Sequence, residues 1–200
     1  MQGSVLFSSL QASGTQNNGM ALAWVILVGM LVALGFVIFI LGRGFQGKSI
    51  RTGASWQQWA VLVLALAGMG VAIYLTYIEI TSAQAICGPL GDCNAVQKSE
   101  YAKVLGIPVG LVGALGYLVI LAAWLWRRFR KDNLASYVPP AIFGMATFGT
   151  LYSIYLTYLE IFVIKAVCIW CLTSAVIMTL LMLLTLAPAA NWLAVSGEEE

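Results

Sequence analysis

Four cysteines are the residues of this 200-residue chain whose type and spacing best suit them to chemistry. Cys168 and Cys171 stand in the motif CIWC, a spacing at which two thiols can close a small ring that exchanges with other thiols. Cys87 and Cys93 flank the turn-forming stretch GPLGD, which lets their ends approach within disulfide range. Thiol–disulfide exchange requires little more than a thiolate within reach of a disulfide. Both pairs are therefore candidate redox-active sites.

The composition indicates where this chemistry takes place. Hydrophobic residues make up 61% of the chain and charged residues 9%, and the mean hydropathy is +0.92, values that exclude an ordinary soluble domain. The net charge is +2, and lysine and arginine cluster beside apolar runs, which argues against nucleic acid as a partner. The chain has no histidine, which removes the commonest general base and most metal sites. We expect a membrane protein that uses its cysteines and no metal.

Five apolar runs are long enough to cross the ~30 Å hydrocarbon core of a bilayer as helices. Pro188 follows the last run, and we expect the fifth helix to end there. The sequence predicts an all-α membrane protein, with a four-helix transmembrane bundle as its core and one extra N-terminal transmembrane helix. The predicted helices are Met20 to Leu41, Trp59 to Ile80, Ile107 to Trp126, Ala141 to Ile164 and Cys168 to Ala187.

These runs divide the chain into four segments. Residues 1–19 are rich in Gln, Ser, Asn and Gly and carry no charge, which predicts a mobile N-terminal tail. Residues 20–56 hold the extra helix and a cytoplasmic linker, and residues 57–188 hold the four-helix domain. Residues 189–200, which end in three glutamates, are expected to form a cytoplasmic tail.

The basic residues predict the orientation of the helices. Seven of them lie in the segments that follow the first and third predicted helices, and three lie on the opposite side. Because positively charged segments stay in the cytoplasm, the N-terminus and both cysteine pairs should be extracytoplasmic and the C-terminus cytoplasmic. A bacterial inner membrane is the expected location. The seven are Arg43, Lys48, Arg51, Arg127, Arg128, Arg130 and Lys131, and the three are Lys98, Lys103 and Lys165.

An internal repeat indicates a core built from two halves. GVAIYLTYIEI, at residues 70–80, matches LYSIYLTYLEI, at residues 151–161, with a constant offset of 81 residues. In both copies a cysteine follows seven residues after the last isoleucine, Cys87 in the first copy and Cys168 in the second. Each half therefore supplies a membrane helix whose outer end leads to a cysteine pair. The alternative is chance, because tyrosine is common at membrane interfaces.

The motifs around the cysteines resemble those of a known family. C-x5-C, then Ser99, then YAKVLGIP with a later glycine and Tyr117, and finally CIWC are similar to the vitamin K epoxide reductase family over about Trp59 to Ala187. The CxxC pair comes last in this chain, whereas in the other quinone-linked family of disulfide-forming membrane proteins it lies in the first loop. The resemblance implies a membrane oxidoreductase in which protein thiols pass electrons to a lipid quinone.

The resemblance also implies a role for each site residue. Cys171 is similar to the cysteine that faces the quinone, and Cys168 to its partner in the active-site disulfide. Cys93 matches the loop thiol that exchanges with Cys168, Cys87 the outer thiol that accepts electrons from a protein partner, and Ser99 the loop hydroxyl that supports the site. The implied acceptor is a quinone of the ubiquinone, menaquinone or phylloquinone type. The implied donor is a separate periplasmic or lumenal thioredoxin-fold thiol protein, whose oxidation would drive disulfide formation.

One residue departs from the vertebrate members of the family, which carry a tyrosine four residues after the last active-site cysteine. This chain has Ala175 there, so quinone reduction is favoured over epoxide reduction. Glu79 and Glu160 lie near the outer ends of their predicted helices. An interfacial position is favoured for these two carboxylates, and proton delivery to the quinone is the alternative.

Two further interpretations treat the cysteines as structural. In the first, the chain is a non-enzymatic membrane scaffold whose disulfides are inert. In the second, four thiolates hold zinc, although a spacing of five residues between Cys87 and Cys93 is long for a metal knuckle.

Between the two pairs, Asn94 is a candidate cap for a short helix in the outer loop.

Overall fold

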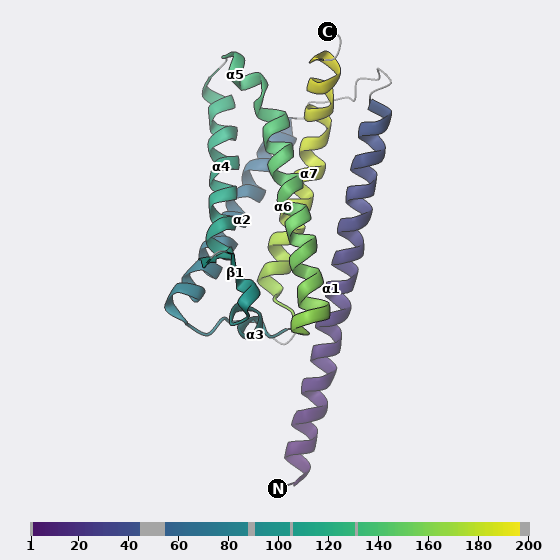
Figure 1. Ribbon diagram of the computed structural model, residues 1–200, viewed down its shortest axis with the longest axis vertical. Coiled ribbons are helices and arrows are strands. Elements are labelled where there is room, and N and C mark those ends of the chain that lie inside the picture. Colours follow the sequence, from purple (N-terminus) through teal and green to yellow (C-terminus); the bar gives the residue numbers. More distant parts are fainter. Residues whose placement is uncertain (1, 45–54, 88–90, 105, 131, 197–200) are drawn as a thin grey trace.

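The computed structural model describes residues 2–44, 55–87, 91–104, 106–130 and 132–196 (Figure 1). Lys48, Arg51, Lys131 and the three C-terminal glutamates, which the sequence places in cytoplasmic segments, lie outside these residues. Within the described part of the chain, five helices are long and apolar enough to cross a membrane, which confirms the predicted fold class. The spans are Asn18–Gly42, Trp56–Thr81, Val109–Phe129, Val138–Ile164 and Ile169–Leu193.

Long helices alternate with short connecting elements along the chain. The long helices are α1 (Gln2–Gly44), α2 (Ser55–Thr81), α4 (Val109–Phe129), α6 (Val138–Leu159) and α7 (Ile169–Ser196). The short elements are α3 (Cys93–Gln97), the 3-10 turn η2 (Glu100–Ala102), strands β1 (Lys103–Val104) and β2 (Ile107–Pro108), α5 (Asn133–Ser136) and the π-helical turn η3 (Glu160–Ile164).

Helices α2, α4, α6 and α7 pack into the predicted four-helix core, and α1 lies along the side of this core (Figure 1). Tyr117, Ile120 and Leu181 are fully buried where the core helices meet. A separate apolar cluster, which includes Met30 of α1 and Leu172 of α7, attaches the extra helix. Close packing of this kind holds helices together within lipid, where the hydrophobic effect between them is lost.

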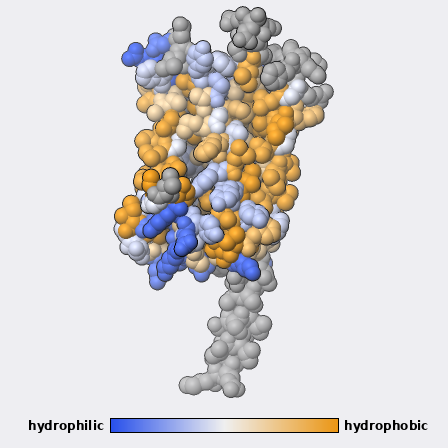
Figure 2. All heavy atoms as spheres, viewed as in Figure 1, coloured by the Kyte–Doolittle hydropathy of each residue, from blue (hydrophilic) through white to orange (hydrophobic). Residues whose placement is uncertain are grey.

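The outer surface of the bundle is apolar across its middle. Figure 2 shows hydrophobic residues over the central part and hydrophilic residues gathered near the ends. Val25 on α1 and Phe148 on α6 are 70% and 69% exposed. Soluble proteins seldom present apolar surface this extensive, because its contact with water is unfavourable. The chain is therefore a multi-pass membrane protein.

Helix α7 continues past Pro188, where the sequence predicts its end. A proline inside a helix has no N–H to offer the carbonyl four residues earlier, which here is that of Leu184. The side-chain amide of Gln57, on α2, donates to this carbonyl instead. The prediction was wrong because a contact between distant segments satisfies the group that the proline leaves without a donor.

Helix α1 also extends further than predicted, because it begins at Gln2 rather than near Met20 and projects beyond the end of the bundle (Figure 1). Residues 2–19 contain no proline, and their polar side chains lower helix propensity by only a few tenths of a kcal/mol each. Extending an existing helix also avoids the cost of a new nucleus. The backbone of the predicted tail is therefore helical.

The loop that follows α2 ends in a small hairpin that leads into α4. Strand β1 pairs antiparallel with β2, so that Lys103 lies opposite Pro108. Gly106, between the strands, has a φ of +82°, which glycine adopts without the penalty that a side chain would bring. Helix α4 begins after this hairpin at Val109, two residues later than predicted, because Ile107 belongs to β2.

Candidate functional site

The first cysteine pair forms a disulfide on the outer loop. The Sγ atoms of Cys87 and Cys93 are 2.02 Å apart. Cys93 is the first residue of α3 and has no exposed surface, whereas Cys87 is half-buried and follows Ile86, which is 80% exposed. Of the two sulfur-bearing residues, Cys87 is therefore the one that an incoming protein can reach.

Side chains beside the disulfide fix the start of α3. Asp92 is the cap of this helix, because its carboxylate accepts a hydrogen bond from the backbone N–H of Ala95 at 3.0 Å. The prediction that Asn94 serves as the cap was wrong. The side chain of Asn94 instead accepts from the N–H of Ala85 at 2.8 Å, and so holds the beginning of the loop. A carboxylate stabilises a helix N-terminus more than an amide does, because it also opposes the helix dipole.

The disulfide contradicts one structural interpretation of the cysteines. A tetrathiolate zinc site requires all four cysteines as thiolates. Two of the four sulfurs are bonded to each other in this structure, and Cys168 and Cys171 are free thiols. The structure thus holds one disulfide and one dithiol pair.

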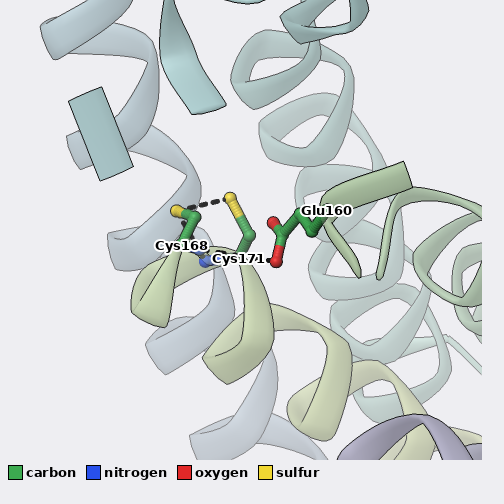
Figure 3. A group of neighbouring side chains, drawn as sticks. All are labelled: Glu160, Cys168 and Cys171. Atoms are coloured by element: carbon green, nitrogen blue, oxygen red, sulfur yellow. Dashed lines mark hydrogen bonds between the residues drawn. The ribbon is translucent and has the colours of Figure 1, made fainter. Parts of the chain in front are cut away.

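The second pair lies at the N-terminus of α7, as the sequence predicts. Cys168 directly precedes the helix, and its carbonyl accepts the N–H of Leu172 at 3.0 Å. Cys171 lies in the first turn, and its thiol donates to the Cys168 sulfur with the two Sγ atoms 2.6 Å apart (Figure 3). The backbone N–H of Cys171 points at the same sulfur, at 3.3 Å.

These contacts favour the thiolate form of Cys168. The pKa of the Cys168 thiol is lowered, first because the Cys171 thiol donates a hydrogen bond to its sulfur, and burial acts in the opposite direction. Backbone N–H groups of the first helical turn and the side chain of Gln97, on α3, add further hydrogen bonds to the charged form. A thiol with a lowered pKa is both a reactive thiolate and a good leaving group in disulfide exchange, so Cys168 is suited to that reaction.

The outer loop packs directly against the segment that precedes Cys168. A Cβ atom at Gly91 would lie 2.2 Å from the carbonyl oxygen of Val167, so this close backbone approach requires glycine. Cys93 and Cys168 are both fully buried and belong to the same apolar cluster. The structure therefore brings the inner cysteine of the loop pair and the first cysteine of CIWC into one buried region.

Two aromatic side chains hold the loop to the CIWC segment. The rings of Tyr74, on α2, and Trp170, between the two CIWC cysteines, have centroids 4.9 Å apart. The indole N–H of Trp170 donates to the carbonyl of Ile86 at 3.0 Å, and the Tyr74 hydroxyl accepts the N–H of Ile86 at 3.1 Å. Ile86 precedes Cys87, so both contacts limit the movement of the loop disulfide relative to CIWC.

A cavity of about 420 Å³ lies inside the bundle next to the second pair. Of the cysteines, all of which are described, Cys171 is the one that lines it. Ser99 also lines this cavity, and its hydroxyl donates to the carbonyl of Val96 at 2.6 Å, which holds the turn between α3 and η2. Gly116 of α4 and Gly144 of α6 line the cavity, and a Cβ atom at either position would meet only open space.

Ala175, which stands where vertebrate members of the family carry a tyrosine, faces away from the cavity. Ala175 is buried in the cluster that attaches α1 to α7, next to residues such as Ala23. Ser174 lines the cavity instead, and its hydroxyl lies 3.0 Å from the hydroxyl of Tyr117, which is fully buried. The α1 helix thus occupies the side of α7 at Ala175, and the polar group three residues after Cys171 is a serine.

Glu160 meets the cysteine pair at the start of the π-helical turn η3 (Figure 3). Its side chain is 2% exposed, and its carboxylate oxygen and the sulfurs of Cys168 and Cys171 lie within 4.8 Å of one another. The backbone N–H of Cys168 donates to the carboxylate at 3.4 Å. The prediction that the Glu160 carboxylate is hydrated was therefore wrong, because packing inside the protein buries it. The chain turns at Lys165, with a φ of 56°, and so returns Cys168 to this carboxylate.

Sequence reasoning assigned no role to Ser174, and it missed the contact between Glu160 and the thiols. A signal for Glu160 was present in the repeat, because a glutamate stands eight residues before the first cysteine of each pair. Ser174 offered no such signal. Its direction into the cavity depends on how α7 is rotated in the bundle, which apolar periodicity does not determine for a helix that is apolar on all sides.

This bundle of membrane-spanning helices, with a disulfide and a dithiol pair at one end and a cavity beside the dithiol, defines a multi-pass membrane thiol protein. Residues 59–186 match the sequence profile of the vitamin K epoxide reductase family. The chain belongs to this family, which confirms the resemblance found from its motifs.

A relative of known activity agrees with this assignment. The chain is 34% identical over 110 residues to the thiol-disulfide oxidoreductase LTO1 of Arabidopsis thaliana. The match covers 51% of this chain and 28% of the relative, so most of that longer protein has no counterpart in the aligned region.

Proposed function

We propose that the protein is a membrane thiol:quinone oxidoreductase that oxidises an extracytoplasmic thioredoxin-fold protein and so drives disulfide formation. Electrons pass from the partner to Cys87 and Cys93, then to Cys168 and Cys171, and finally to a lipid quinone. Membership of the family and the thiol-disulfide activity of the relative support the oxidoreductase class.

The observation that carries the proposal is the placement of Cys171. This cysteine lines the cavity, while its partner Cys168 is fully buried on the side that contacts the outer loop. One member of the pair therefore faces the space for an acceptor, and the other faces the donor disulfide. In a scaffold with inert disulfides, there would be no need for one cysteine of the pair to face a cavity and the other to face a second disulfide.

The cavity suits the head group of a quinone. Its volume of about 420 Å³ falls within the range of about 300 to 1,000 Å³ for small-molecule sites. The lining is mostly apolar, as a hydrocarbon ring requires, and Ser174 and Ser99 are polar residues that line the same cavity as Cys171. Ubiquinone, menaquinone and phylloquinone share such a ring and differ in its substituents. The cavity therefore supports a quinone as the acceptor and does not select one of the three.

The partner is expected to react at Cys87. Because exchange requires access to a sulfur, the half-buried Cys87 is the position at which a thiolate of a thioredoxin-fold protein can attack the loop disulfide. A membrane quinone pool is more oxidising than a protein dithiol, and tenfold in equilibrium corresponds to about 30 mV, so the favoured direction is oxidation of the partner.

Quinone reduction by the purified protein tests the proposal. A reduced thioredoxin-fold protein is supplied with ubiquinone or menaquinone in detergent micelles, and the loss of quinone absorbance is followed. We expect loss that depends on the enzyme and stops after alkylation of its cysteines. The scaffold alternative predicts no loss with any quinone, together with cysteines that mild reductants leave unchanged.

We further propose that the cysteine end of the bundle is extracytoplasmic. The described helices place the loop of Cys87 and the start of the α1 span at one end, and the basic residues Arg127, Arg128 and Arg130 at the other (Figure 1). Positively charged segments stay in the cytoplasm, which supports this orientation in a bacterial inner membrane.

Labelling of engineered cysteines tests the orientation. In a chain whose four native cysteines are replaced by serine, we expect Ser82→Cys to react with a membrane-impermeant maleimide in intact cells. Arg130→Cys, at the opposite end, should react only after the cells are opened. Both positions are exposed, so access to the reagent is matched. Reaction of Arg130→Cys in intact cells would reverse the orientation.

A further inference from the structure

Glu160 places a carboxylate oxygen within 4.8 Å of both sulfurs of the CIWC pair, and electron transfer between thiols does not by itself require a carboxyl group. Its side chain is 2% exposed, and burying a carboxylate in an apolar bundle is costly. The group lines the same cavity as Cys171 and interacts with the thiol of that residue. Its position gives it access to both the sulfurs and the space proposed for the quinone.

The repeat provides an internal comparison for this residue. Glu79 is the equivalent glutamate in the first copy, 81 residues earlier. One of its oxygens accepts the N–H of Gly110 at 3.4 Å, and the other is buried with no hydrogen-bond partner among the described residues. Glu79 is not among the residues that line the cavity. Of these two equivalent glutamates, Glu160 is therefore the one placed to exchange a proton with the pair.

The proposed reaction needs one more proton than the reduced cysteine pair holds. The Sγ atoms of Cys168 and Cys171 are 2.6 Å apart, so a single proton shared by the two sulfurs leaves Cys168 as the thiolate and Cys171 as the thiol. The reduced pair thus holds one proton and one negative charge. Reduction of a quinone to a quinol takes two electrons and two protons, so the pair lacks one proton.

We propose that the carboxyl group of Glu160 carries this second proton in each catalytic cycle, an inference that rests on the proposed function. The two sulfurs give two electrons to the quinone and join in a disulfide. Cys171 releases one proton to the forming quinol and Glu160 releases the other, which leaves a carboxylate. When the loop dithiol next reduces the pair, its two thiols release two protons, one to Cys171 and one to Glu160. Protons and charge balance over the cycle.

Few other titratable groups act on this site. The thiols of Cys168 and Cys171, on the α7 segment, face the Glu160 carboxyl group directly. Glu79, on α2, acts electrostatically on Cys171, and Lys103, on β1, acts on Glu79. Within the described part of the chain, no other charged group acts on Glu160. The pH dependence of the quinone step should therefore report mainly on this carboxyl group and the two thiols.

The variant Glu160→Gln tests the inference, because glutamine keeps the shape of the side chain and cannot release a proton. Reduced full-length protein is mixed rapidly with a short-chain ubiquinone, and quinone loss is followed over a range of pH. We expect the rate to fall about 10²- to 10⁴-fold, as on removal of a general acid, with the half-saturating quinone concentration unchanged. In the wild type, the rate should be lost as pH rises through ionisation of the carboxyl group. In Glu160→Gln that dependence should disappear.

A second measurement needs no quinone. The reduced cysteine pair is alkylated with a maleimide as a function of pH. The first thiolate, on Cys168, forms while Glu160 holds its proton, and Cys171 ionises only at higher pH, where Glu160 is a carboxylate. Because this charge opposes formation of the second thiolate, its removal in Glu160→Gln should move the midpoint of Cys171 alkylation about one pH unit lower. If the wild type reduced no quinone, the proposed function would fail, and an unshifted midpoint would overturn the role of Glu160 separately.

Glu79→Gln is the matched control, because it makes the same change at the equivalent position of the other repeat. This variant should keep most of the wild-type rate and its pH dependence.

Glu160→Asp retains a carboxylic acid, and it replaces Glu160→Gln as the test variant if Glu160→Gln does not fold. It should give an intermediate rate with a displaced pH profile. Wild-type rate and profile in either Glu160 variant would overturn the inference.

Discussion

Replacement of Cys171 by alanine is expected to abolish steady-state quinone reduction. The sulfur of Cys171 is the one that lines the cavity, and without it Cys168 has no partner with which to form the active-site disulfide. We expect a loss of about a thousandfold or more, as for removal of an enzymatic nucleophile. The loop disulfide is intact in this variant, so reduced partner protein should still be oxidised once, by one equivalent per enzyme.

Two measurements separate these effects: quinone absorbance under turnover, and alkylation of the partner protein after a single mixing. Thr173→Ala is the matched control, because Thr173 lies on the same turn of α7, is exposed, and bonds only within its own helix, to the carbonyl of Ile169. It should behave as the wild type. Steady-state activity retained in Cys171→Ala would remove this cysteine from the pathway.

Residue type and spacing were enough to predict the class of the protein. Apolar runs of about twenty residues predict helices that span the membrane. In lipid, the backbone N–H and C=O groups of such a run can form their hydrogen bonds within the segment only if it is helical. The CIWC spacing placed two thiols at a helix N-terminus regardless of how the helices pack, and Cys168 and Cys171 lie there. Such features depend on local geometry, which a single sequence contains.

Predictions failed where a distant segment determined the outcome. Pro188 does not end α7, because Gln57 of another helix donates to the carbonyl left without a donor. Glu160 is buried, because a π-helical turn and a residue with positive φ bring Cys168 back to it. In each case the sequence identified the residue and the packing decided its surroundings.

The structure also bears on how electrons would cross between the two pairs. Cys93 and Cys168 share one buried cluster, and the backbone of Gly91 contacts the residue before Cys168. The side chain of Gln97, four residues after Cys93, helps to lower the pKa of the Cys168 thiol. This arrangement supports a relay in which a Cys93 thiolate attacks Cys168 of the oxidised pair and Cys171 leaves as the thiolate. Cys87 then attacks Cys93, which closes the loop disulfide and releases Cys168.

Replacement of Cys87 by serine should trap this relay. The variant retains Cys93 as a nucleophile and lacks the thiol that resolves the mixed bond, so a disulfide between Cys93 and Cys168 should become the main species in oxidised protein. Quinone reduction by the partner should fall to background, because the loop pair can no longer close. Digestion under non-reducing conditions and mass spectrometry would show the two cysteine peptides joined.

The matched control is Cys93→Ser, which removes the attacking thiol from the same loop and keeps Cys87. Its oxidised form should contain the Cys168–Cys171 bond and a free Cys87, because Cys87 lies on the accessible side of the loop rather than in the buried cluster core with Cys168. The two variants carry the same chemical change six residues apart, so a difference between them reports on position alone. If Cys87→Ser instead held the Cys168–Cys171 bond with Cys93 free, or joined Cys93 to Cys171, the order of the relay would be wrong.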